Sequence, residues 1–120
     1  MWEVEYTDEF CFWWNKLTES EQVEIAAVVN LLERLGPKLQ FPFSSSIEGT
    51  TCRRLRELRI QYRGMPYRVL YAFDPRRTAI LLLGGNKKGN NRWYETNVPM
   101  AEKLYQTHIF ILEEEEEINV

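Results

Sequence analysis

Two arginines and a lysine are the side chains of this chain best suited to chemistry on a phosphate: Arg59, Arg68 and Lys87. Arg59 and Arg68 each interrupt an apolar alternation on consecutive predicted strands, so both can point to one face of a sheet. Guanidinium groups stay charged and offer planar, paired donors that match a phosphate. Lys87 emerges from the end of the following strand and adds a point charge. These three residues are the predicted catalytic set.

Further basic and aromatic residues occur close to this set in the sequence. Aromatic rings stack on unpaired bases, and lysine and arginine neutralise backbone phosphates. The predicted RNA-binding residues are Arg56, Arg63, Lys88, Arg92, Trp93 and Tyr94. An alternative stays open, in which Arg59 and Arg68 form structural ion pairs with Glu57, Glu95 or the C-terminal glutamates.

Other site chemistries lack the residues that they need. The single histidine, His108, shares the apolar side of a predicted helix, so we expect it to pack. Cys11 and Cys52 match neither a C-x-x-C motif nor a metal-ligand spacing, and we expect reduced thiols. The glycine-rich segment after residue 83 contains neither the G-x-x-x-x-G-K-[ST] pattern nor the G-x-G-x-x-G pattern of nucleotide-binding loops. We therefore expect neither a metal ion nor a cofactor.

The charge of the chain is unevenly distributed. The formal net charge is only −3, yet residues 53–92 hold eleven basic and two acidic side chains, a net charge of +9. Residues 1–36 and 93–120 each carry a net charge of −6. A basic block of this size suggests a polyanionic partner, and a strand surface neutralised by surrounding acidic helices is the alternative.

The elements that must position these residues follow from periodicity and end signals. Thr7 and Thr18 each precede acidic residues and an apolar helical pattern, and Gly36 and Pro37 end that pattern. The predicted elements are a strand over 2–6, two helices within 7–36, an irregular loop over 37–52, strands over 58–63, 67–73 and 78–83, a polar segment over 84–97, and a helix that Pro99 opens and that ends near 112.

This order predicts an α+β fold with two N-terminal helices packed on a twisted antiparallel β-sheet, followed by a C-terminal helix. The helices should cover one face of the sheet and leave the other face to Arg59 and Arg68. One domain over 1–112 and a disordered acidic tail over 113–120 are expected. The acidic N-terminus and the lack of an 18-residue apolar run indicate a cytoplasmic protein without a membrane segment.

Several strings of the chain resemble one known family. Residues 55–59 (LRELR) and 67–74 (YRVLYAFD) are similar to the signature of the RelE/ParE toxin superfamily, in particular its HigB-like, phage Gp49-like branch. Residues 80–89 (ILLLGGNKKG) resemble that branch's last strand and its lysine, and residues 92–95 (RWYE) resemble the start of its C-terminal segment. The resemblance covers nearly the whole chain in order.

The resemblance implies a RelE-like fold and the role of toxin in a type II toxin–antitoxin system. Such toxins are typically ribosome-dependent mRNA endonucleases, held inactive by a small antitoxin that often has a helix-turn-helix. Attack of a 2′-hydroxyl on the adjacent phosphate is the implied reaction, and Arg59, Arg68 and Lys87 match the basic site residues. Some members use C-terminal histidines, which this chain lacks there, so the general base stays open among Lys87, Tyr94 and Glu95. A ParE-like toxin that binds a protein such as DNA gyrase, and an inactive relative, are the alternatives.

Overall fold

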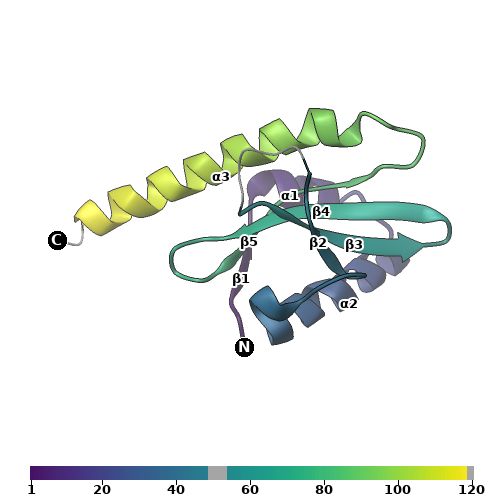
Figure 1. The fold of residues 1–120 in the computed structure, drawn as a ribbon, viewed down its shortest axis with the longest axis horizontal. Coiled ribbons are helices and arrows are strands. Elements are labelled where there is room, and N and C mark those ends of the chain that lie inside the picture. The colour runs from purple at the N-terminus through teal and green to yellow at the C-terminus, as the bar shows by residue number, and fades with distance from the viewer. Residues whose placement is uncertain (49–53, 119–120) are drawn as a thin grey trace.

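The computed structural model describes residues 1–48 and 54–118, so Cys52 lies outside the described residues. Two layers of helices enclose one sheet (Figure 1). The elements in chain order are β1 (Val4–Tyr6), α1 (Asp8–Trp14), α2 (Glu19–Leu35), the short 3₁₀-helix η1 (Gly36–Lys38), β2 (Ser44–Ser46), β3 (Arg56–Tyr62), β4 (Met65–Phe73), β5 (Ala79–Asn86) and α3 (Trp93–Ile118).

The sheet has five strands in the order β1-β5-β4-β3-β2. Strands β3 to β5 form the predicted antiparallel meander and β2 extends it, but β1 pairs with β5 in parallel. The sheet is therefore mixed, and the prediction of an antiparallel sheet is wrong for its first strand. Alternation of apolar residues identifies a strand, but it carries no information on the partner or direction of that strand.

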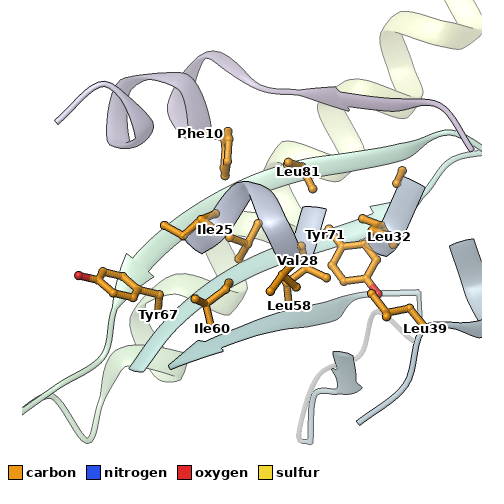
Figure 2. Close-up of a cluster of buried hydrophobic side chains, with 12 residues drawn as sticks. Phe10, Ile25, Val28, Leu32, Leu39, Leu58, Ile60, Tyr67, Tyr71 and Leu81 are labelled. Atoms are coloured by element: carbon orange, nitrogen blue, oxygen red, sulfur yellow. The ribbon is translucent and has the colours of Figure 1, made fainter. Parts of the chain in front are cut away.

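Helices α1 and α2 begin where the sequence predicts. The hydroxyl of Thr7 accepts a hydrogen bond from the Phe10 amide, and Thr18 forms a complete capping box with Glu21. The apolar sides of both helices pack on one face of the sheet (Figure 2). Burial of this cluster is the main force that fixes the two helices there. Its central members are Phe10, Ile25, Val28, Leu32, Leu58, Ile60, Val69, Tyr71 and Leu81.

Helix α3 packs on the opposite face of the sheet, as Figure 1 shows. The prediction that this face is free of helices is therefore wrong. Two consecutive glycines of β5 explain how both faces are covered: an added Cβ on Gly84 would collide with the Trp13 ring from α1, and one on Gly85 would lie 2.6 Å from the Trp93 indole nitrogen. Each glycine thus leaves room for one tryptophan on its own face of the sheet.

Three further boundaries differ from the sequence prediction. The segment read as a loop contains β2, because its serines pair with β3 although they show no apolar alternation. Helix α3 begins at Trp93 instead of Pro99, since Trp93 and Val98 are buried against the sheet before the proline. It continues to Ile118, through the glutamates expected to be disordered, because glutamate propagates a helix well once one has formed. Of the described helices, none is long and apolar enough to cross a membrane.

Candidate functional site

Arg59 and Arg68 lie side by side on the face that α3 partly covers. They are direct partners in the β3–β4 ladder, so their side chains leave the sheet on the same face, as predicted. Their exposure differs from the prediction, because Arg68 is only 5% exposed and the Arg59 side chain about 30%. The site is therefore half-buried instead of an open basic surface.

Glu57 pairs with both arginines. Its Oε2 lies 3.2 Å from Nη1 of Arg59, and its Oε1 lies 3.6 Å from Nε of Arg68. The Ser45 hydroxyl donates to the same carboxylate at 2.8 Å. Glu57 is almost fully buried. The ion-pair alternative left open by the sequence is thus present for both arginines, and their orientations are fixed because a buried carboxylate holds them.

Tyr94, in the first turn of α3, completes this network. Its hydroxyl donates to Oε1 of Glu57 at 2.6 Å and accepts a hydrogen bond from Nε of Arg68 at 3.2 Å. Burial raises the pKa of Tyr94, the bond to Glu57 adds to this rise, and the contact with Arg68 opposes it. Lys87 follows β5, and its ammonium lies 5.5 Å from the centre of the Tyr94 ring. We refer to Glu57, Arg59, Arg68, Tyr94 and Lys87 as the Glu57 network.

The other predicted RNA-binding residues are scattered. Trp93 is 5% exposed and packs against Gly85, so its ring has little free surface for a base. Arg56 projects from the opposite face of β3 to Arg59, and its Nε donates to the Ser44 hydroxyl. Neither residue belongs to the Glu57 network, and a role of either in RNA binding stays a prediction. The remaining three are exposed around the site: Arg63 in the β3–β4 turn, and Lys88 and Arg92 in the segment before α3.

Sequence reasoning missed Glu57 as a site residue and treated it only as a possible ion-pair partner. The signal was available, because Glu57 and Arg59 are two residues apart on one predicted strand and must share a face. Ser45 could not have been found in this way, since only the pairing of Ser45 with Glu57 in the β2–β3 ladder brings it to the site.

A second polar cluster anchors α3 to the sheet. Asp74, directly after β4, is buried, and its carboxylate accepts hydrogen bonds: Oδ2 lies 2.9 Å from Nε2 of His108 and 2.6 Å from Nη2 of Arg76. The Tyr105 hydroxyl donates to the Phe73 carbonyl beside it. The sequence predicted that His108 only packs, but His108 also joins this hydrogen-bonded cluster, which links α3, the helix that carries Tyr94, to the sheet.

Comparison with solved structures defines the class of the fold. The isolated RelE toxin of Escherichia coli superposes with a TM-score of 0.58 over 83% of this chain and 99% of its own, at 12% identity. A chain of the RelE–RelB complex of Pyrococcus horikoshii superposes with a TM-score of 0.53 over 73% of this chain and 97% of its own, at 19% identity. The fold is therefore that of the RelE toxins, which confirms the α+β, RelE-like prediction.

Sequence comparison gives the family. Residues 12–106 match the family described as phage derived protein Gp49-like (DUF891). A Mycobacterium tuberculosis protein assigned as toxin HigB3 is 40% identical over 76% of this chain and 79% of its own length. A second protein of that organism, assigned as toxin HigB2, is 33% identical over 81% of this chain and 49% of its length. The chain belongs to the Gp49-like family and is a HigB-like toxin of the RelE superfamily.

Proposed function

We propose that this toxin is an mRNA endonuclease that acts on ribosome-bound mRNA and that the Glu57 network is its active site. The observation that carries the proposal is the pair of arginines fixed side by side by one buried carboxylate and next to a tyrosine hydroxyl. This arrangement suits a reaction in which negative charge develops on a phosphate, because prearranged donors need no reorganisation during the reaction.

The reaction is a transesterification. The 2′-oxygen of one nucleotide forms a bond to the adjacent phosphorus, and the bond from phosphorus to the 5′-oxygen of the next nucleotide breaks. Arg59 and Arg68 would hold the phosphate oxygens through paired donors. The ribosome would hold the mRNA so that the attacking 2′-oxygen, the phosphorus and the leaving 5′-oxygen lie in line. Such positioning can supply a large part of a rate enhancement, so the site needs few catalytic side chains.

Tyr94 and Glu57 are the groups placed to move the attacking proton. The 2′-hydroxyl proton would pass to the Tyr94 oxygen as the Tyr94 proton passes to Oε1 of Glu57, across the 2.6 Å hydrogen bond. A positioned acid or base typically contributes roughly 10²–10⁴-fold to a rate. The Lys87 ammonium, 5.5 Å from the centre of the Tyr94 ring, would protonate the departing 5′-oxygen.

A small antitoxin is the expected protein partner. RelE toxins are known in complexes with the antitoxin RelB from both Escherichia coli and Pyrococcus horikoshii. By analogy we propose a cognate antitoxin, with a helix-turn-helix as in many systems of the HigB type, that keeps the toxin from the ribosome. We place the active toxin in the cytoplasm, where translating ribosomes are found.

Induced expression followed by mapping of mRNA 5′ ends tests this function. The wild-type protein should create new 5′ ends within translated reading frames, and Arg68→Lys, which keeps the charge but loses the planar donors, should create few. Arg34→Lys, an exposed change on α2, is the matched control and should behave as the wild type. Growth arrest without new mRNA ends would instead favour a protein target such as DNA gyrase, and no arrest would indicate an inactive relative.

A further inference from the structure

An aromatic ring outside the Glu57 network is exposed directly beside it. Phe41 lies between η1 and β2 and is 72% exposed. The centre of its ring lies 5.2 Å from the guanidinium carbon of Arg59, within the range of a cation–π contact. The amide of Arg59 donates to the Phe43 carbonyl at 2.8 Å, which ties this segment to β3. Phe41 is therefore exposed although its backbone neighbourhood is fixed.

The other described aromatic residues beside the network expose less of their surface than Phe41 does, and Phe43 for example is 42% exposed. Trp93 is buried against Gly85, and the Tyr94 hydroxyl is bonded to Glu57 and Arg68 while Lys87 lies over its ring. A nucleotide whose phosphate contacts Arg59 would have its base within reach of a ring that touches the same guanidinium. Flat arginine and aromatic groups are the usual surfaces on which unpaired bases stack.

We propose that Phe41 is a stacking surface for a base of single-stranded RNA whose phosphate is held by Arg59. This inference rests on the proposed RNA function and adds a binding position to it. Every base has a π-face, so the contact should raise the affinity for RNA of many sequences. The arginine beside the ring favours a polyanion over an apolar segment of a protein, because the Arg59 charge remains partly exposed.

Equilibrium binding to two probes tests the proposal. One probe is an unstructured RNA hexamer of mixed sequence, and the other is a ribose–phosphate backbone of the same length without bases. Phe41→Ala should weaken hexamer binding by roughly 5- to 100-fold, which corresponds to about 1–3 kcal/mol for one stacked base at 1.4 kcal/mol per tenfold. The same variant should bind the base-free probe as tightly as the wild type does.

Two further variants separate stacking from other causes. Phe41→Tyr keeps a ring of the same shape and should bind the hexamer as the wild type does. Phe12→Ala removes a ring of similar exposure on α1, which packs on the other face of the sheet, and should change neither affinity. A tyrosine variant as weak as the alanine variant would contradict stacking.

The remaining outcomes overturn the proposal in distinguishable ways. Equal hexamer binding by Phe41→Ala and the wild type would show that the ring serves another contact, such as one to a protein. An equal loss on both probes would show that Phe41 acts only by orienting Arg59. If the wild-type protein binds neither probe, this inference fails, whereas failure of the proposed function would appear as an absence of cuts in ribosome-bound mRNA.

Discussion

At the scale of single residues, Glu57 organises the site. A buried carboxylate is costly unless it is paired and hydrogen-bonded, and Glu57 has two arginines, a tyrosine hydroxyl and a serine hydroxyl as partners. The same contacts restrict Arg59, Arg68 and Tyr94 to one arrangement. The charge on the arginines is partly offset, but their donors are fixed before any substrate binds, which is the property that a phosphate site requires.

The first prediction concerns the Tyr94 hydroxyl. Tyr94→Phe keeps the ring beside Lys87 but removes the bridge between Arg68 and Glu57, so mRNA cleavage should fall by roughly 10²-fold or more. The unfolding free energy should fall by about 3 kcal/mol, because two hydrogen bonds to charged groups are lost while Glu57 and Arg68 keep each other as partners. Cleavage assays and urea unfolding measure the two effects. Cleavage by the variant at the wild-type rate would remove Tyr94 from the proposed chemistry.

The sequence could predict that Arg59 and Arg68 come together, because alternation along neighbouring strands places them on one face. It could not predict their burial, since that depends on the packing of α3 over the sheet. The burial of Trp93 has the same origin. Its indole occupies the space that Gly85 leaves open, and a strand pattern does not reveal which aromatic ring will fill such a space.

At the scale of elements, α3 depends on Gly85 of β5 for its position, because Trp93 packs against this glycine. Gly85→Ala should displace Trp93, and with it the first turn of α3 and Tyr94. Forcing a methyl group into a packed contact typically costs roughly 1–3 kcal/mol of stability. Thermal unfolding and tryptophan fluorescence should both report the change, and the smaller ring of Trp93→Phe in the double variant should recover part of the loss. An alanine variant as stable as the wild type would show that α3 is not held in this way.

The hydrogen bonds of Asp74 should make the packing of α3 on the sheet less stable at low pH. Burial alone would raise the pKa of Asp74, but hydrogen bonds from His108, Arg76 and the Thr78 amide outweigh burial and lower this pKa below its ordinary value of 3.8. A lowered folded-state pKa contributes stability that is present above the unfolded value and is lost as the pH falls through the folded value.

Asp74→Asn tests this contribution. The variant should lose about 2 kcal/mol of unfolding free energy at pH 7, and the difference from the wild type should shrink as the pH falls below about 4. Urea unfolding at a series of pH values measures both quantities. Glu24→Gln, an exposed change on α2, is the control and should follow the wild-type curve. A difference that stays constant down to pH 3 would argue against the ionised Asp74 as the anchor.

Local signals predicted most elements, because caps and periodicity act over a few residues. The N-caps Thr7 and Thr18 and the alternation of β3 and β4 are of this kind. The exceptions depend on distant partners: β2 is held by β3, the direction of β1 is set by β5, and the start of α3 is set by the burial of Trp93.

At the scale of the whole molecule, fewer basic side chains of residues 53–92 are available to RNA than the net charge of +9 suggests, because several pair with carboxylates. Glu57 pairs with Arg59 and Arg68, and Arg76 pairs with Asp74 and with Glu5 of β1. The exposed basic residues Lys88 and Arg92 lie in the segment that leads into α3, beside the Glu57 network. RNA backbone contacts should therefore concentrate at this end of the sheet.

Salt dependence tests this distribution. Each phosphate contact with a single strand contributes roughly −0.7 to the slope of log K against log salt. The double variant Lys88→Ser, Arg92→Ser should make the slope shallower by about 1.4, because two contacts are lost. Arg34→Ser on α2 should leave the slope unchanged. A double variant with the wild-type slope would place the RNA elsewhere on the molecule.

Cleavage of a ribosome-bound mRNA by the purified toxin tests the central claim most directly. Primer extension on the mRNA should show defined cuts with the wild-type protein and with Arg34→Lys. A 2′-deoxynucleotide placed immediately 5′ of a mapped cut should abolish that cut, because the attacking oxygen is then missing. Cuts that persist at the deoxy position, or a wild-type protein that arrests growth while it leaves the mRNA intact, would contradict the account.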